Sequence, residues 1–280
     1  MNEEQSKPIK KLESTLKKIQ ERANTAKKVI EQKGGSLPLF PEMESAMPNH
    51  LARSALFAPI RPGRRTIYDK SILASRDDVE ILYSGKQLDM ADNDVFLQAL
   101  RASQGYATGA PVIFNRAEFL REIGRSTGKN DYVWLEESFD RLATGTLYIK
   151  TKNYKTVLHL IDAYAKNEIS GKYWLRLNPE ILKLFSQKSY GFIDMDARRQ
   201  INRGQELAKW LQNYVASHEG GKTHTIDGKS LQKWSGTMGR FRDFMSRSLP
   251  KALAELERLC LIQNSRIRED GKVTWYKPTR

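Results

Sequence analysis

Between residue 240 and residue 278, apolar and polar positions alternate with two different periods. Residues 240–259 place apolar side chains on one side of a helix, at steps of three or four: Phe241, Met245, Leu249, Ala252, Leu256 and Leu259. The other side is polar and mainly cationic: Arg240, Asp243, Arg247 and Lys251, with Ser246 beside them and Arg242 on the flank. Residues 261–278 read as two short strands around a turn. The pattern predicts an amphipathic helix packed on a core, followed by a β-hairpin.

Pro250 lies inside the predicted helix. A proline in a helix interior removes one backbone hydrogen bond and costs about 3 kcal/mol. The sequence therefore predicts either a kink at this point or a new helical segment capped by Ser248.

The elements before this unit have the same order in two parts of the chain. Residues 204–217 are predicted to form a helix, 224–226 a strand, and 229–234 a short helix capped by Asp227, with a turn at 235–237. Earlier, helices are predicted at 94–102, 115–123 and 132–142, and strands at 79–83, 111–114, 146–150, 156–165 and 173–177. Helix, strand, two helices and hairpin is the winged-helix order. The predicted fold is α+β and mainly helical, with two tandem winged-helix domains at 66–195 and 196–280.

The region before the predicted domains has a different composition. Residues 1–35 form a basic arm, either helical or flexible, because a weak heptad pattern runs through 8–33. Residues 36–65 are predicted to be an irregular linker because prolines recur there. A short apolar cluster, 36–40, lies at its start.

Composition suits a soluble globular protein, with 39% hydrophobic and 29% charged residues. No run approaches the ~18 apolar residues of a membrane span, and the N-terminus has no signal-peptide layout. We therefore expect a cytoplasmic protein. Cys260, the one cysteine, allows no internal disulfide and no cysteine-based metal site, and we expect it to be part of the core.

Positive charge is concentrated at the two ends of the chain. The formal net charge is +14, with +6 in residues 1–65, zero in 66–195 and +8 in 196–280. A basic domain favours a polyanion, because phosphate contacts release counterions. Together with a cationic helix and a cationic hairpin, this predicts that the second domain reads duplex DNA.

The residues predicted to contact DNA in the second domain are Lys233, Thr237, Arg240, Arg242, Ser246, Arg247, Lys251, Arg266, Arg268, Lys272 and Lys277. The corresponding helix of the first domain also carries acidic residues and is a poorer reader. We expect it to contact the DNA backbone through Lys129, Asn130 and Tyr132, and the rest of that domain to serve self-association.

The sequence offers little support for a catalytic activity. Segment 124–130 has three residues between its glycines and Asn130 after its lysine, whereas a phosphate-binding loop needs four residues and Ser or Thr. The four histidines are scattered with no His-x-His pair, although His218 and His224 could approach each other. We therefore expect no enzyme activity, no cofactor and no metal.

Residues 47–57, MPNHLARSALF, resemble the linker of the TrfA family of plasmid replication initiators. The last 40 or so residues also resemble iteron-binding plasmid initiators, including a proline placed like Pro250. The resemblance implies two tandem winged-helix domains that bind repeated origin sites (iterons) and open an adjacent AT-rich region. It also implies recruitment of the host helicase, its loader and the sliding clamp, contact with single-stranded AT-rich DNA, and a dimer that becomes monomeric to initiate.

The same resemblance implies a sliding-clamp-binding pentapeptide of the form Gln-Leu-x-Leu-Phe. The aligned residues here are Ser36, Leu37, Pro38, Leu39 and Phe40. The leucines and the phenylalanine match, but serine replaces glutamine, which removes hydrogen bonds worth about 1 kcal/mol each. The alternative is that this apolar cluster packs on the first domain.

Two functions remain open. The first is a replication initiator that binds iterons, and the second is a DNA-binding repressor of its own operon with no replication role. The clamp-like peptide favours the first, because a simple repressor has no use for it.

Overall fold

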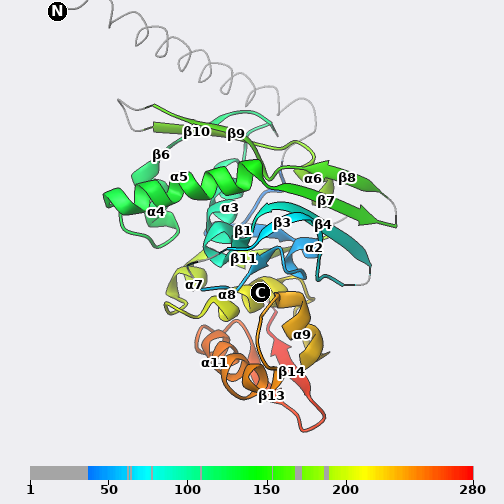
Figure 1. The fold of residues 1–280 in the computed structure, drawn as a ribbon. Helices are drawn as coiled ribbons and strands as arrows, with labels where there is room; N and C mark the ends of the chain where they lie inside the picture. Colours follow the sequence, from blue (N-terminus) through cyan, green and yellow to red (C-terminus); the bar gives the residue numbers. More distant parts are fainter. Residues whose placement is uncertain are drawn as a thin grey trace, which may run out of the picture.

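The computed structural model describes residues 37–279 except 62, 64, 77, 108, 153, 168–171 and 186–188. The predicted helix over 8–33 and Ser36 therefore lie outside the described residues. The fold is mixed α/β (Figure 1), with five small sheets among the described residues. This differs from the mainly helical fold that the sequence predicted, because many strands lack the period-two pattern by which a sequence reveals them.

The first half is built around α3 (Met90–Ala102), which is buried along most of its length. After it come β6 (Val112–Asn115), α4 (Arg116–Glu122) and α5 (Lys129–Thr144). Asn115 caps α4 as predicted, its side chain accepting from the Ala117 and Glu118 amides. Two further strands, β9 (Ile161–Lys166) and β10 (Lys172–Leu177), complete a sheet of order β6-β10-β9.

A second sheet lies beside this unit. It joins β3 (Ile67–Leu73), β4 (Val79–Lys86), β7 (Thr146–Thr151) and β8 (Lys155–Leu158) in the order β3-β4-β7-β8, all antiparallel. Burial alternates along β4, so this strand has one face on the core. The single strand predicted over 156–165 is wrong, because the chain leaves this sheet after Leu158 and enters the other one at Ile161.

The linker predicted over 36–65 is not irregular throughout. It contains β1 (Glu44–Pro48), α2 (Asn49–Ala52) and β2 (Phe57–Ala58). β1 pairs with β11 (Tyr190–Asp194), and β2 pairs with β5 (Leu88–Asp89). Met47 and Leu51 are each 1% exposed, so segment 47–57 belongs to the core. Proline breaks helices but tolerates short strands and turns, which is why it misled the sequence argument.

The second half begins after α6 (Ile181–Leu184), β11 and α7 (Met195–Gln200). Its elements are α8 (Glu206–Ala216), β12 (Lys222–Asp227), α9 (Gly228–Ser235), an irregular long helix, β13 (Gln263–Ile267) and β14 (Lys272–Lys277). The sheet order β12-β14-β13 repeats the order β6-β10-β9 of the first half. The predicted repetition of element order therefore extends to strand pairing, with β7 and β8 inserted in the first copy.

The long helix is irregular where the sequence placed Pro250. It consists of α10 (Phe241–Asp243), a π-helical turn η2 (Phe244–Ser248) and α11 (Leu249–Arg258). The Leu249 amide donates to the Phe244 carbonyl, five residues back. Proline has no amide hydrogen to continue an α-helical ladder, and a π-turn accommodates the extra residue just before it. The π-turn was not among the two predicted alternatives, and the predicted new segment capped by Ser248 is wrong, because Ser248 is helical and its side chain makes no capping bond.

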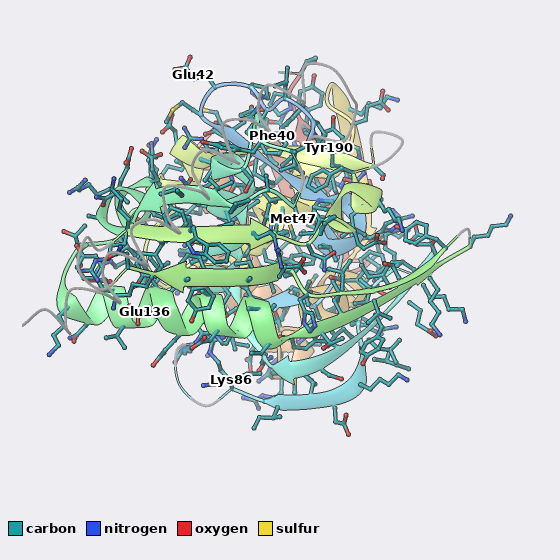
Figure 2. The ribbon with its side chains drawn as sticks, turned by 90° about the horizontal axis from the view of Figure 1, so that it is seen from above. Phe40, Glu42, Met47, Lys86, Glu136 and Tyr190 are labelled. Atoms are coloured by element: carbon teal, nitrogen blue, oxygen red, sulfur yellow. The ribbon has the colours of Figure 1, made fainter. Side chains whose placement is uncertain are left out.

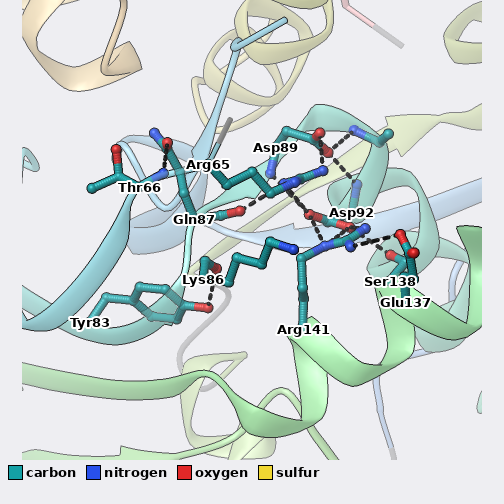
Figure 3. Close-up of polar contacts among 11 residues, drawn as sticks. Arg65, Thr66, Tyr83, Lys86, Gln87, Asp89, Asp92, Glu137, Ser138 and Arg141 are labelled. Carbon is teal, nitrogen blue, oxygen red and sulfur yellow. Dashed lines mark hydrogen bonds and ion pairs between the residues drawn. The ribbon is translucent and has the colours of Figure 1, made fainter. Parts of the chain in front are cut away.

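Two buried polar networks start from α3. In the first (Figure 3), Asp92 accepts from Arg141 Nη2 at 2.8 Å, from Ser138 Oγ at 2.7 Å and from Arg65 Nη1 at 2.9 Å. This network holds α5 and the segment before β3 against α3. Because a buried carboxylate is stable only when it is paired, the network fixes the position of α5.

The second network joins the two halves. Asp94 accepts from Arg198 Nε at 2.7 Å and from Lys209 Nζ at 2.5 Å, and Arg198 also donates to Asn93 Oδ1 at 2.7 Å. These side chains come from α3, α7 and α8. They tie the helix that opens the second half to the central helix of the first.

Candidate nucleic-acid interface

The N-terminal part of the long helix presents a cationic surface, as the sequence predicted. Its exposed members are Arg240, Arg242, Ser246, Arg247 and Lys251, and Lys233 of α9 is also exposed. We call these six residues the basic face. On the core side, Phe244, Leu249, Ala252 and Leu256 are buried. The five-residue step from Phe244 to Leu249 spans the π-turn, so Phe244 takes the buried place predicted for Met245.

The cations of the basic face differ in how they are held. Arg240 pairs with Asp243, Nε to Oδ2 at 2.9 Å, although its side chain is 78% exposed. Within the described part of the chain, Arg242, Arg247 and Lys251 make no ion pair. Their positive charge is therefore not neutralised by a neighbouring carboxylate and can act on a polyanion.

The turn between α9 and α10 is held by several bonds. Gly236 ends α9 in the left-handed conformation, at φ 69°, and a Cβ there would lie 3.0 Å from Ala55 Cβ. Thr237 shares a 2.7 Å hydroxyl hydrogen bond with Ser235, so this predicted DNA contact is already occupied within the turn. These contacts position the turn that leads into the start of the basic face.

The hairpin β13–β14 carries the predicted second group of cations. Arg266, Arg268 and Lys272 are exposed, and the last two lie near Asp270 at 3.2 and 3.7 Å. Lys277 is placed differently, because its ammonium donates to the Ala216 carbonyl at 3.1 Å and to the His218 carbonyl. It caps the C-terminus of α8, where a cation is favourable, so its predicted contact with DNA would cost these bonds.

The first half holds its three predicted DNA contacts at the start of α5. Lys129 and Asn130 are exposed, and Tyr132 is half-buried beneath the Arg116 guanidinium, 4.0 Å from its ring centre. Figure 1 shows α5 and α11 at opposite ends of the molecule. The two predicted sets therefore do not form one patch.

The predicted clamp-binding peptide is largely packed on the protein. Leu37 and Phe40 are 4% and 7% exposed, whereas Leu39 is 82% exposed. The Phe40 ring lies 6.5 Å from those of Phe185 and Phe192, and Figure 2 shows it close to Tyr190. This packing of Leu37 and Phe40 is what the alternative interpretation predicted.

Two histidines approach each other just after the C-terminal end of α8, as the sequence allowed. The rings of His218 and His224 are 4.9 Å apart, and His218 Nδ1 lies 2.7 Å from the Tyr214 carbonyl. Burial lowers the pKa of His218 to about 3, and the charges of Arg53 and Lys277 act in the same direction. Among the described residues, no group of three His, Cys, Asp or Glu side chains could hold a metal ion.

Acidification is expected to destabilise the protein through His218. The unfolded chain takes up a proton near pH 6.5, while the folded chain does so only near pH 3. The contribution of neutral His218 is thus complete above pH 6.5 and is lost as pH falls from 6.5 towards 3. Urea unfolding at pH 7, 5.5 and 4.5 measures it. His218→Gln should show a smaller loss over this range than the wild type, and equal losses would contradict the assignment.

A family model identifies the family of this chain. The family model described as TrfA protein matches residues 14–270. The chain belongs to the TrfA family. A curated relative in this family, the plasmid replication initiator protein TrfA of Escherichia coli, is 27% identical over 187 residues. That match covers 64% of this chain and 48% of the relative, so it spans about half of the relative's length.

Two solved structures are similar in fold to this TrfA-family chain. Domains 2 and 3 of RctB align with a TM-score of 0.54 at 15% identity, over 84% of this chain and 99% of theirs. The Pi initiator protein, solved in complex with iteron DNA, aligns with a TM-score of 0.55 at 13% identity, over 85% of this chain and 97% of its own. At these identities the likeness concerns the fold alone. No helix in the described part of this TrfA-family chain is both long enough and apolar enough to cross a bilayer.

Two features of this TrfA-family chain were missed or misjudged. Met238 is 88% exposed beside the basic face, although the sequence analysis did not single it out. Its signal was an apolar residue in a turn between cationic segments. Cys260, which we predicted to be core, is exposed and has a positive φ of 55°, because the chain turns there out of α11.

Proposed function

We propose that this TrfA-family chain is a plasmid replication initiator that binds iterons through the basic face and the hairpin. The observation that carries the proposal is the basic face itself. Three cations that make no ion pair among the described residues project from a helix whose other side is buried, which suits insertion into a major groove. The name of the Pi structure, which includes iteron DNA, supports the choice of ligand.

We also propose that the chain contains two winged-helix domains. We interpret α8–β14 as a winged-helix domain, with α10–α11 as the recognition helix and β13–β14 as the wing. In the other domain, α3, β6, α4, α5, β9 and β10 take the corresponding places. That domain would contact the DNA backbone at the start of α5 and mediate self-association, with dimers dissociating before initiation.

Footprinting on the parent plasmid's origin tests this function. Repeated protected blocks beside an AT-rich segment, with that segment becoming reactive to single-strand probes, are expected. One protected block confined to a promoter would instead identify a repressor of its own operon. Supercoiled plasmid incubated with the protein and Mg²⁺ should stay intact, and nicking would contradict a purely non-catalytic role.

Recruitment of the host helicase, its loader and the sliding clamp completes the proposal. Clamp binding through 37–40 requires Leu37 and Phe40 to leave their packing, while Leu39 is already exposed. A segment that must be released binds more weakly, because its docked state competes with the partner.

Clamp retention in a pull-down should fall when Leu39 is replaced by alanine. Leu39 is 82% exposed, so Leu39→Ala leaves the core intact, and Ile72→Ala, at 72% exposure, is a matched control. Phe40→Ala should lower retention as well, although it also removes core packing. Unchanged retention by Leu39→Ala and Phe40→Ala would exclude the clamp site.

A further inference from the structure

A cavity of about 450 Å³ lies between the two halves of the chain, and its lining includes no residue of the basic face. Its lining from the first half consists of Arg76 and Asp78, which lie just before β4. The second half contributes aromatic side chains from α8, α9, β12 and β14. The size falls within the range typical of small-molecule sites, and such sites often form between domains.

Most of the side chains that line the cavity from the second half are aromatic or imidazole rings. Tyr214, His218, His224 and Trp275 lie with neighbouring ring centres 4.6–6.2 Å apart, and Trp234 is 6.3 Å from Tyr214. Tyr214 and Trp275 are 2% and 1% exposed, so packing holds them in place. The half-buried rings of His218, His224 and Trp234 line the cavity in contact with these fixed rings, and they offer surfaces on which a ligand can stack.

The lining from the first half carries one charge of each sign, the Arg76 guanidinium and the Asp78 carboxylate. The Arg76 side chain is 40% exposed, and its ion pair with Asp78 is long, Nε to Oδ1 at 3.8 Å. Burial raises the pKa of Tyr214 to about 12, and the positive charges of Arg53 and Arg76 oppose that rise, which places both cations near the phenol. Arg53 itself is held by Ser217, so Arg76 is the cation with freedom to meet a ligand.

We propose that this cavity binds a nucleotide, with the base against the aromatic rings and the phosphate against Arg76. Aromatic side chains stack on any base, and a guanidinium is well matched to phosphate. A free mononucleotide and an unpaired nucleotide within a DNA strand share this chemistry. The inference does not depend on the basic face, because none of its residues lines the cavity.

Calorimetric titration of the full chain tests the site. The probes are dAMP and dTMP, with deoxyadenosine and inorganic phosphate as separate ligands. At least one nucleotide should bind saturably at one site per chain, and more tightly than either fragment. Arg76→Ala should weaken that binding at least fivefold.

Arg176→Ala is the matched control for charge and exposure. Its side chain is 46% exposed and makes a similarly long pair with Asp162, at 3.9 Å, but it lies on β10 and does not line the cavity. The Arg176→Ala variant should bind nucleotide with the affinity of the wild type. Equal weakening by the two substitutions would overturn the proposal.

The source of the nucleotide is resolved with a single-stranded (dT)10 oligonucleotide. Binding of mononucleotide that needs Arg76 identifies a free nucleotide, while Arg76-dependent binding of the oligonucleotide alone identifies an unpaired base in a strand. Absence of Arg76-dependent binding in both arms overturns the site. Duplex footprints of Arg76→Ala should match those of the wild type. The nucleotide titrations therefore test the cavity, and the footprints test iteron binding independently.

Discussion

Arg198→Ala is expected to lower the free energy of unfolding by about 3–5 kcal/mol, the usual cost of removing one partner of a buried ion pair. Arg198 is 2% exposed and donates to five acceptors in two helices, α3 and α8. Its loss would leave the Asp94 carboxylate with Lys209 as its cationic partner and would leave Asn93, Gln212 and Asn213 short of a donor. The penalty comes from these stranded polar groups more than from the lost attraction.

Urea unfolding followed by circular dichroism measures this effect. The neighbouring Arg199→Ala is the control, because Arg199 is 26% exposed and its pairs with Asp196 and Glu122 are near the surface. Surface pairs contribute about 0–1 kcal/mol. If Arg198→Ala were no more destabilising than Arg199→Ala, the buried network would not be what joins the two halves. Biphasic unfolding of Arg198→Ala would indicate that the halves had become independent.

The double variant Arg242→Ala, Arg247→Ala is expected to weaken binding to an iteron duplex by about 2–6 kcal/mol, at about 1–3 kcal/mol for each arginine that reads a base. Both side chains are exposed and neither makes an ion pair within the described residues. If they contact phosphates instead, the slope of log K against log salt should become less steep by about one unit for each. Arg240→Ala should have a smaller effect than Arg247→Ala, because Arg240 already pairs with Asp243.

Fluorescence anisotropy with a labelled iteron, at several salt concentrations, measures both quantities. Lys86→Ala, Lys150→Ala removes the same charge from the sheet β3-β4-β7-β8 and serves as the control. Binding by the arginine variant that equals binding by this lysine variant would refute the placement of the DNA-reading surface.

The site was more predictable than the fold around it. The basic face follows from helical spacing within one segment, and the sequence predicted its exposed cations although the π-turn shifted the buried residue from Met245 to Phe244. Lys277 could not be placed in this way. Its partners, the Ala216 and His218 carbonyls, are about 60 residues away in the chain, and no local pattern reports them.

The peptide 36–40 shows a similar limit. Its composition fitted both a docking motif and a packed cluster, because apolar residues serve both. Phe185 and Phe192 decide the position of Phe40, and they come from a distant part of the chain. The network of Arg198 was likewise invisible, since a sequence does not show which charges meet in the core.

By itself, the sequence determined the amphipathic helix and hairpin, the caps at Asn115 and Asp227, the repeated order of elements and the concentration of positive charge in residues 196–280. These depend on contacts within a few residues, where spacing and residue type are sufficient. Only the tertiary structure decided that segment 44–58 belongs to the core, that Lys277 caps a helix, and that an aromatic cavity lies between the halves. Each of these results from pairing between segments distant in the chain, which is set by packing of the whole and not by any local pattern.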